Sequence, residues 1–443
     1  MTTSLLYDYQ RLGMQRLMRG NCLLADEMGL GKTVEVASAI SKIGTDKKSI
    51  VIIAPLSAIS VWIDIMAIWC SIPIKQWRKG DPISQCIVCN PESISHLIME
   101  LNNKPIDILI ADEAHMYKNR KTLRSKLLLR LSRSASIVWL LTGTPILNRV
   151  DELWNLLHIL HPNNFKSYWA FVQRWANARP GKYGWVIDDY VRDEYLDSFA
   201  STLSPYVLRR TKEDVGMQLP PVTYETVTIP MTMDQRKLYK AISTQILVET
   251  SENKDPITIE NLLTRTTRLR QAALCPSIID PDIKAGQKYQ VLSEIISGTE
   301  DKIIVFCEWS SPLITYWHSR YTACENSIML YGQMTQRERE EALAKWRHPK
   351  GPQTLLATYG TGGVALTLTE SSTVIQLNET WVPAINEQAI ARVVRHGQTK
   401  PVNVYRLRTK GSIEEVIAGT IGDKTALVEA VNEALRKWAS QNV

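Results

Sequence analysis

The stretch Ala25-Asp26-Glu27-Met28-Gly29-Leu30-Gly31-Lys32-Thr33 stands between a short apolar run and a helical pattern. Its glycines let backbone N–H groups approach phosphate oxygens, while Lys32 can reach the β- and γ-phosphates of a nucleotide and Thr33 offers a hydroxyl to Mg²⁺. The strict phosphate-loop motif begins with a glycine that would fall at Asp26, so a second motif must support the interpretation. The stretch predicts ATP and Mg²⁺ as ligands.

The second motif is Asp112-Glu113-Ala114-His115, which follows the apolar run of residues 106–110. The run predicts a buried parallel strand, and the motif would stand at its exposed end. Asp112 would hold Mg²⁺ through water, and Glu113 would orient and deprotonate the water that attacks the γ-phosphate. An acidic pair at a strand end is often only a solvated cap. Because both motifs follow apolar strands in this order, the sequence favours an ATPase.

The chain has 443 residues, which is more than a single hydrophobic core usually contains, so its length indicates two domains. The hydrophobic content of 44% is normal for a globular protein. The chain has no apolar run of membrane-spanning length, and its N-terminus lacks the charged start of a signal peptide. We therefore expect no membrane contact and an intracellular location, in the cytoplasm or nucleoid of a prokaryotic or viral system or in a eukaryotic nucleus. The net charge of +7 favours a polyanionic partner only weakly.

The seven cysteines are scattered and odd in number, which indicates reduced core thiols rather than a disulfide framework. Cys86 and Cys89 have the spacing of half a zinc site, but no second pair follows. We expect both to lie in the core.

Apolar strand-like runs alternate with helical stretches in both halves of the chain. They are residues 49–54, 86–89, 106–110 and 137–141 in the first half, and 302–306, 327–330, 354–357, 373–377 and 402–407 in the second. This alternation predicts an α/β fold with two doubly wound parallel sheets. Residues 151–290 carry few strand signals and predict helices and linker, with Leu219-Pro220-Pro221 as the best domain boundary.

Two further segments would suit a protein whose conformation changes with ATP binding and hydrolysis. Leu141-Thr142-Gly143-Thr144-Pro145 follows a strand, so Thr142 and Thr144 could relay the state of the γ-phosphate, although such a turn is often only a turn. Arg392 and Arg395 are three positions apart, which predicts one face of a helix. A guanidinium supplied by an opposing lobe would stabilise transition-state charge and make hydrolysis depend on lobe closure. The alternative is a solvated basic helix face.

These residues resemble the SWI/SNF-type double-stranded-DNA translocases of helicase superfamily two, and the similarity covers nearly the whole chain. Residues 6–13 resemble the family's adenine-reading motif, and residues 26–33 its phosphate loop, aspartate included. The most specific match is residues 206–215, followed by Leu219-Pro220-Pro221, which resembles the family's interlobe segment. Further similar motifs are residues 54–57, 89–93, 141–145, 268–276, 303–309, 332–335, 358–368 and 392–402.

The resemblance implies two RecA-like lobes. Residues 1–160 would form the ATP-binding lobe, 161–285 helical protrusions and the interlobe linker, 286–412 the second lobe, and 413–443 bracing helices. The implied ATP contacts are Gln10, Glu27, Met28, Gly29, Leu30, Gly31, Lys32, Thr33, Gly363, Arg392 and Arg395, with Thr33 and Asp112 on Mg²⁺. The implied DNA contacts are Pro55, Leu56, Ser57, Asn90, Gln333, Thr335, Gly360 and Thr361. The residues implied to couple the two sites are His115, Thr142, Thr144 and Gln388.

The resemblance also implies a function: an ATP-dependent motor that moves along double-stranded or forked DNA and remodels DNA or protein–DNA complexes without processive unwinding. Specificity would come from a protein partner, and the chain would be a monomer without DNA. Two alternatives stay open. One is a DEAH-type DNA or RNA helicase. The other is an ATP-gated DNA-binding subunit of a larger complex, which would need a defective catalytic residue. The catalytic candidates Lys32, Asp112, Glu113, Arg392 and Arg395 are all present.

Overall fold

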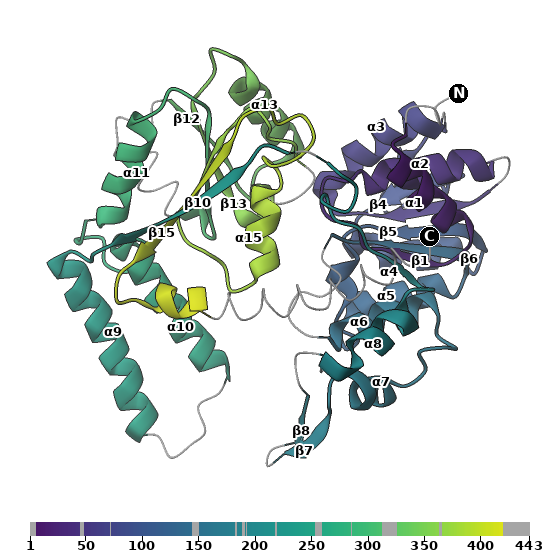
Figure 1. The fold of residues 1–443 in the computed structure, drawn as a ribbon, viewed down its shortest axis with the longest axis horizontal. Helices are drawn as coiled ribbons and strands as arrows, with labels where there is room; N and C mark the ends of the chain where they lie inside the picture. Colours follow the sequence, from purple (N-terminus) through teal and green to yellow (C-terminus); the bar gives the residue numbers. More distant parts are fainter. Residues whose placement is uncertain are drawn as a thin grey trace. The chain divides into compact units, whose positions relative to one another are not determined.

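The computed structural model describes residues 6–44, 48–70, 72–143, 150–181, 184–187, 191, 193–217, 219–252, 259–284, 286–311, 326–362 and 366–419. These residues form two compact units. Unit 1 contains the described residues before position 218, and unit 2 contains those from Leu219 onward. Each unit is built around its own sheet (Figure 1).

Unit 1 contains a seven-stranded sheet in the order β3-β4-β2-β5-β6-β1-β9, with every pairing parallel. Its strands are β1 (Cys22–Leu24), β2 (Ile50–Ile53), β3 (Lys75–Gln76), β4 (Cys86–Cys89), β5 (Ile106–Ala111), β6 (Ala135–Leu141) and β9 (Val207–Leu208). Helices α1 (Asp8–Met18), α2 (Lys32–Ile43) and α3 (Ile59–Cys70) cover one face, and α4 (Ile94–Leu101), α5 (Leu123–Ser132) and α6 (Glu152–Leu160) cover the other (Figure 1). Because both faces are covered, β2 and β4 are buried at every position.

The chain between α6 and β9 adds a small helical region to unit 1. It contains α7 (Tyr168–Trp175), α8 (Leu196–Leu203) and an antiparallel hairpin of β7 (Arg179–Gly181) and β8 (Gly184–Val186). Aromatic side chains of both helices, among them Phe171, Trp175 and Phe199, extend the core beneath the sheet.

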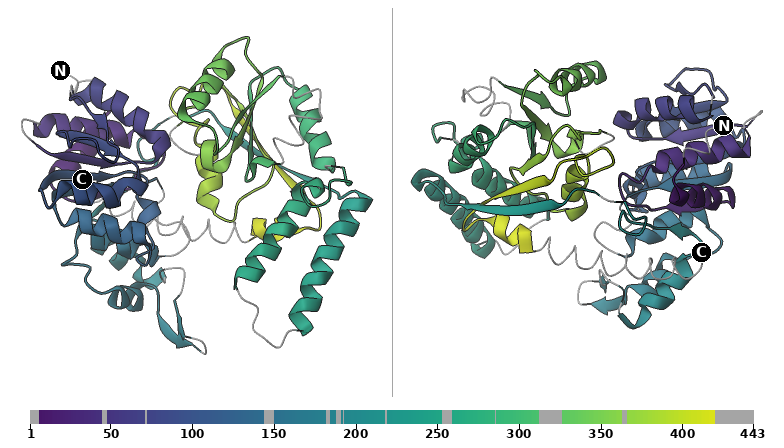
Figure 2. Two further views of the ribbon diagram at one scale, coloured as in Figure 1. Left: turned by 180° about the vertical axis from the view of Figure 1, so that it is seen from behind. Right: turned by 45° about the horizontal axis from the view of Figure 1, so that its top comes forward.

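Unit 2 contains a six-stranded parallel sheet in the order β10-β15-β14-β11-β13-β12. Its strands are β10 (Val222–Ile229), β11 (Ile303–Cys307), β12 (Ser327–Leu330), β13 (Thr354–Thr358), β14 (Thr373–Gln376) and β15 (Val402–Thr409). Its helices are α9 (Met233–Glu252), α10 (Ile259–Leu274), α11 (Gln287–Ser297), α13 (Gln336–Arg347), α14 (Tyr359–Gly362) and α15 (Pro383–Ile390). In all views α9 and α10 lie side by side and extend away from this sheet (Figures 1 and 2).

The two parallel sheets confirm the predicted α/β fold class. The prediction of helices and linker over residues 151–290 was wrong for β7, β8, β9 and β10. β10 consists of β-branched residues with one Tyr and one Glu, most of them exposed, and it is a strand because it pairs along its whole length with β15. Residues 413–419 are helical, and the rest of the expected bracing helices lies outside the described residues.

Cys86 and Cys89 are both buried on β4, and burial raises the pKa of each thiol to about 12. Residues three apart on a strand point to opposite faces, so the pair does not share a metal site. Within the described ranges, no helix is both long enough and apolar enough to cross a bilayer.

A buried ion pair in unit 2 joins α11 to the chain that follows β15. Lys288 is 2% exposed, and its Nζ donates to the carbonyl oxygens of Leu377 and Leu407, each at 2.9 Å, and to Glu414 at 2.8 Å. We expect Lys288→Met to lower the free energy of unfolding by about 3–5 kcal/mol, because Glu414 would stay buried without its partner. Chemical denaturation measures this. Lys288→Met combined with Glu414→Leu should recover part of the loss, and an equal loss in both variants would contradict the explanation.

Candidate functional site

Loops from several strands meet along one edge of the unit 1 sheet. Because all its strands are parallel, their carboxyl ends share this edge, and β5, β6 and β1 are consecutive neighbours there. Asp112 follows β5, Thr142 follows β6, and the stretch 25–31 follows β1. The topology therefore brings these three motifs into one region, although residues 25 and 142 are 117 positions apart in the chain.

The loop between β1 and α2 has the backbone of a phosphate cradle. Gly29 and Gly31 have φ angles of +90° and +82°, which side-chain-bearing residues rarely adopt. A Cβ atom at Gly31 would also stand 2.6 Å from Nε2 of Gln10. Gly31 is the N-cap of α2 and gives it no capping side chain, so the first-turn N–H groups suit an anionic ligand.

Lys32 is held inside this loop. Its Nζ donates to the carbonyl oxygens of Asp26 at 2.7 Å and Glu27 at 3.2 Å. Burial lowers the pKa of Lys32, and the nearby carboxylates of Asp26, Glu113 and Asp112 oppose this shift. The ammonium group therefore stands between the loop and the acidic motif, where a phosphate would neutralise it.

Asp112 is oriented by two hydrogen bonds. Oδ2 accepts from the indole Nε1 of Trp62 at 2.9 Å, and Oδ1 accepts from the backbone N–H of Glu113 at 2.8 Å. Burial, followed by the charge of Glu113, raises the pKa of Asp112 to about 6, while the bond from Trp62 opposes the shift. Trp62 lies on α3, and sequence reasoning missed it because its apolar neighbours only indicated a core helix.

Glu113 and His115 connect the acidic motif to the turn after β6. Glu113 has a left-handed φ of +48° and begins a short 3₁₀ turn, η4 (Ala114–Tyr117). His115 Nδ1 is 3.2 Å from Oε2 of Glu113 and 3.4 Å from the hydroxyl of Thr142. The structure thus brings together three residues that the sequence assigned to catalysis and coupling. Thr144, another residue expected to couple the sites, lies outside the described residues.

The oxygen donors at this edge fit Mg²⁺. In the described part of the chain, no group of three or more His, Cys, Asp or Glu side chains could hold a metal ion unaided. Thr33 in the first turn of α2 and Asp112 supply one hydroxyl and one carboxylate. Mg²⁺ prefers such oxygen ligands and completes its shell with water and substrate phosphates, so these residues suit an ion that arrives with a nucleotide.

The other expected ATP contacts are partly occupied by the protein itself. Gln10 is 6% exposed; its Nε2 donates to the carbonyl oxygen of Leu30 at 3.1 Å, and its Oε1 accepts from the N–H of Tyr7 at 3.2 Å. Glu27 forms an ion pair with Lys212 at 3.2 Å. Met28 packs closely against Gly143. Gln10 therefore supports the loop, and its adenine contact stays a prediction, as does the role of Gly363, which lies outside the described residues.

The expected DNA loops of unit 1 follow β2 and β4, which are neighbours in the sheet. Pro55 precedes a 3₁₀ turn, η2 (Leu56–Ala58), in which Leu56 is 53% exposed. The side chain of Ser57 lies outside the description. The side-chain amide of Asn90 donates to the carboxylate of Glu92 at 3.0 Å and accepts from the hydroxyl of Ser93, two residues of the next 3₁₀ turn, η3 (Pro91–Ser93).

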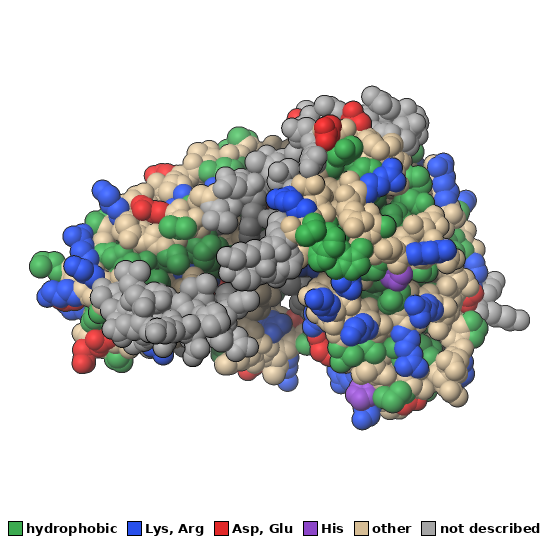
Figure 3. Space-filling model, turned by 90° about the horizontal axis from the view of Figure 1, so that it is seen from below, with side chains coloured by type: hydrophobic (Ala, Val, Ile, Leu, Met, Phe, Trp, Pro, Cys, Tyr) green, Lys and Arg blue, Asp and Glu red, His purple; other side chains and the backbone are tan. Residues whose placement is uncertain are grey.

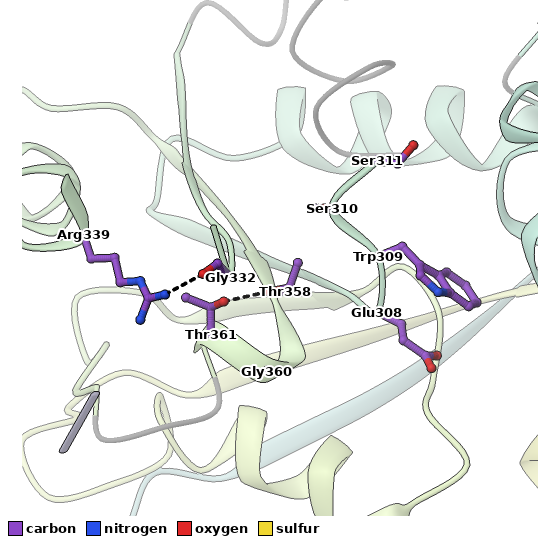
Figure 4. Close-up of a pocket in the computed structure, with 9 residues that line it drawn as sticks. All are labelled: Glu308, Trp309, Ser310, Ser311, Gly332, Arg339, Thr358, Gly360 and Thr361. Atoms are coloured by element: carbon purple, nitrogen blue, oxygen red, sulfur yellow. Dashed lines mark hydrogen bonds between the residues drawn. The ribbon is translucent and has the colours of Figure 1, made fainter. Parts of the chain in front are cut away.

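Unit 2 has a pocket of about 530 Å³ at the carboxyl ends of β11, β12 and β13 (Figure 4). Gly360 and Thr361 line it, and Thr361 accepts a hydrogen bond from the hydroxyl of Thr358 at 2.9 Å. Arg339 also lines it; its Nη2 donates to the carbonyl oxygen of Gly332 at 3.0 Å, while its buried Nε has no acceptor within the described residues. Sequence reasoning missed Arg339, whose only local signal is its place one turn after Thr335.

Thr335 itself has a structural task. It is the N-cap of α13 and forms a capping box with Glu338, accepting from its backbone N–H at 3.3 Å and donating to its carboxylate at 2.8 Å. We expect Thr335→Ala to lower the free energy of unfolding by about 1 kcal/mol and Thr335→Ser to restore most of it, as measured by thermal unfolding. A lack of effect from Thr335→Ala would contradict this.

Gln333 is exposed, so Gln333→Ala tests the predicted DNA contact without disturbing the cap.

The prediction that Arg392 and Arg395 lie on one face of a helix was wrong. α15 ends at Ile390, and both arginines lie in the turns that follow. Val393 and Val394 are buried there, and the carbonyl oxygen of Arg392 accepts from the N–H of Leu368 at 2.9 Å, so the chain leaves the helical path. Arg395 Nη1 donates to the carbonyl oxygen of Leu366 at 3.3 Å, and burial lowers the pKa of Arg395. Gln388, also expected to couple the sites, is buried on α15.

Comparison with known proteins places this chain in a family. The model of the SNF2-related domain matches residues 11–78 and 84–278, and that of the helicase conserved C-terminal domain matches residues 287–397. Human chromodomain-helicase-DNA-binding protein 6 is 28% identical over 502 residues, covering 99% of this chain and 18% of that protein. An uncharacterised ATP-dependent helicase of Mycoplasma genitalium is 26% identical over 438 residues, covering 92% of this chain and 40% of that protein.

Among solved structures, the SWI2/SNF2 ATPase core of Sulfolobus solfataricus in complex with double-stranded DNA matches with 24% identity and a TM-score of 0.43, covering 99% of this chain and 95% of that one. This chain spans only 18% of the length of the chromodomain-helicase relative. The SNF2-related model alone covers more than half of the chain. The family expected from the sequence is thereby confirmed, and the chain belongs to the SNF2-related family of helicase-like ATPases.

Proposed function

We propose that this chain is an ATP-driven motor that moves along double-stranded DNA without processive strand separation. The observation that carries the proposal is the sheet edge of unit 1, where the phosphate loop, the Asp112–Glu113 pair and the His115–Thr142 contact follow three neighbouring strands. The chain's membership of the SNF2-related family supports the same function. The name of the chromodomain-helicase relative includes DNA binding, which supports DNA as the partner.

Each residue of this edge has a task in the proposed hydrolysis. Lys32 and the first turn of α2 bind the phosphates. Thr33 and Asp112 provide oxygen ligands for Mg²⁺, which would neutralise phosphate charge. Glu113 takes the proton of the attacking water, and Arg392 and Arg395 contribute guanidinium charge toward the transition state. Because His115 contacts both Glu113 and Thr142, a change at the γ-phosphate would be transmitted to the turn after β6.

The DNA would be held through its phosphates. In unit 1 the loops at Leu56 and Asn90 share the sheet edge with the nucleotide loop, and in unit 2 the pocket with Thr361 and Arg339 offers hydroxyl and guanidinium donors. Residues 118–133 contain seven Lys or Arg and no acid. Figure 3 shows many Lys and Arg and few acidic side chains on one face of unit 1. Contacts of this kind are independent of base sequence, as translocation requires.

The test is ATP hydrolysis by the purified chain without nucleic acid and with equal nucleotide concentrations of blunt duplex, single strand, forked DNA and RNA. Lys32→Ala is the control. Strong stimulation by duplex that the control lacks supports the motor, and additional stimulation by forks indicates fork remodelling. Stimulation by single strands or RNA alone would instead indicate a DEAH-type helicase.

Movement is tested separately from hydrolysis. A motor on duplex DNA should displace a third strand from a triplex in an ATP-dependent way. The same protein should not separate a long blunt duplex. Unwinding of that duplex would contradict the proposed mechanism.

A further inference from the structure

A buried ionic cluster lies beneath the phosphate loop, and the proposed reaction does not use it. Asp26 and Glu35 have no exposed surface, and Arg210 is 9% exposed. The Nε of Arg210 is 3.1 Å from both carboxylate oxygens of Asp26, and its Nη2 is 3.0 Å from both oxygens of Glu35 and also contacts Asp26. Its Nη1 donates to the carbonyl oxygen of Tyr9. One guanidinium therefore joins the loop, α2, the start of α1 and the segment after β9.

The surrounding packing is shaped around this cluster. A Cβ atom at Gly13 of α1 would fall 1.7 Å from Oε2 of Glu35 and 2.7 Å from Nη2 of Arg210. No side chain larger than hydrogen fits there without moving the cluster. Asp26 and Glu35 outweigh the cost of burying Arg210 and raise its pKa, so it stays charged, while burial and the charge of Asp26 raise the pKa of Glu35. The close packing and the charge of Arg210 thus hold the three side chains of the cluster in one arrangement.

The segment that carries Arg210 also holds the backbone of the loop. The N–H of Ala25 donates to the carbonyl oxygen of Leu208 at 2.7 Å, and the N–H of Glu27 donates to that of Arg210 at 2.8 Å. The backbone N–H of Lys212 then donates to the carboxylate of Glu27 at 2.9 Å. The first half of the phosphate loop is therefore bound residue by residue to the segment after β9.

The carbonyl groups fixed in this way are the ones that hold Lys32. Its ammonium group donates to the carbonyl oxygens of Asp26 and Glu27, the residues that Arg210 and its neighbours secure. A chain of contacts thus runs from the guanidinium through Asp26 to the cation expected to bind the nucleotide. The carrying segment is followed within ten residues by Leu219, where unit 2 begins.

We propose that Arg210 is a positioning residue for ATP binding: through Asp26 it fixes the loop carbonyls that place Lys32. The role rests on the proposed function, because it requires the loop to bind ATP. It assigns a task to the interlobe segment, which would transmit a displacement near Leu219 to the nucleotide site. Because Arg210 is proposed to act through Asp26 and Lys32, its effect should disappear when Lys32 is absent.

The experiment measures the affinity of the full chain for the slowly hydrolysed analogue ATPγS by calorimetry, without DNA. Asp26→Asn keeps the shape of the side chain and leaves one carboxylate, Glu35, for the guanidinium. We expect it to raise the Kd about tenfold, the effect of one charge-assisted hydrogen bond. Arg210→Lys keeps the cation but loses the fork and should raise the Kd by a similar factor. Asp107→Asn, whose carboxylate accepts from the N–H of Ser49 at the opposite end of β5, is the matched control and should leave the Kd unchanged.

A double-mutant cycle separates positioning from general stability. In a Lys32→Ala background, Asp26→Asn should change the Kd less than twofold. An unchanged Kd in folded Asp26→Asn and Arg210→Lys variants, or the same tenfold loss with and without Lys32, would overturn the proposal. If the wild type binds ATPγS but its hydrolysis ignores duplex DNA, the proposed motor fails while this test still stands, because no DNA is used in it.

Discussion

In the Glu113→Gln variant, kcat for DNA-stimulated ATP hydrolysis is expected to fall by roughly 10²–10⁴-fold, the usual contribution of a general base. The amide has nearly the shape of the carboxylate but cannot take a proton from water. ATP affinity should change little, because the loop and Lys32 bind the phosphates and neither is altered. Steady-state hydrolysis with saturating duplex DNA gives kcat, and calorimetry with ATP gives the affinity.

Glu100→Gln is the matched control for this change. Glu100 is exposed at the end of α4, and replacing it should leave kcat unaltered. A Glu113→Gln variant with wild-type kcat would remove Glu113 from the reaction. A loss of ATP affinity as large as the loss of kcat would assign Glu113 to nucleotide binding instead.

The sequence predicted the two sheets because their buried strands have a recognisable apolar composition. A parallel strand covered on both faces is a continuous apolar run, as residues 50–53 and 303–306 are. β10 gives no such signal, because its exposed Thr and Glu residues resemble a loop until β15 is known to lie beside it. Local composition therefore identifies buried strands and misses exposed ones that depend on a distant partner.

The same distinction separates the site residues that were predicted from those that were not. Lys32, Asp112 and Glu113 belong to short motifs whose chemistry is local. Trp62 acts on Asp112 from 50 positions away, and Arg210 acts on Asp26 from 184 positions away. No periodicity in the sequence connects such pairs, because only the topology of the sheet makes them neighbours.

The error at the arginines has a different cause. Spacing of three implies a shared helix face only while the helix continues, and the helical path ends at Ile390. Gly397, with a φ of +99°, then helps turn the chain away. The roles proposed for Arg392 and Arg395 therefore depend on the chemistry of the guanidinium and not on a common helix face.

Arg392→Ala is expected to lower kcat by about 10³–10⁵-fold, the range found when a guanidinium that stabilises phosphoryl-transfer charge is removed. Duplex affinity and ATP affinity should change far less, because the charge matters most in the transition state. Arg392→Lys should not restore the rate, since an ammonium group lacks the planar fork. Arg395→Ala should lower kcat as well, and it should also reduce thermal stability because Arg395 supports the carbonyl of Leu366.

Arg337→Ala is the control for a lost arginine in unit 2, because Arg337 is 89% exposed and pairs only with Glu341 along its own helix among the described residues. Such a pair contributes little to stability, and the variant should hydrolyse ATP at the wild-type rate. If Arg392→Ala keeps kcat within threefold of the wild type, unit 2 supplies no essential charge through that residue. The catalytic set would then be confined to the sheet edge of unit 1, and the proposed dependence of hydrolysis on both units would have to be abandoned.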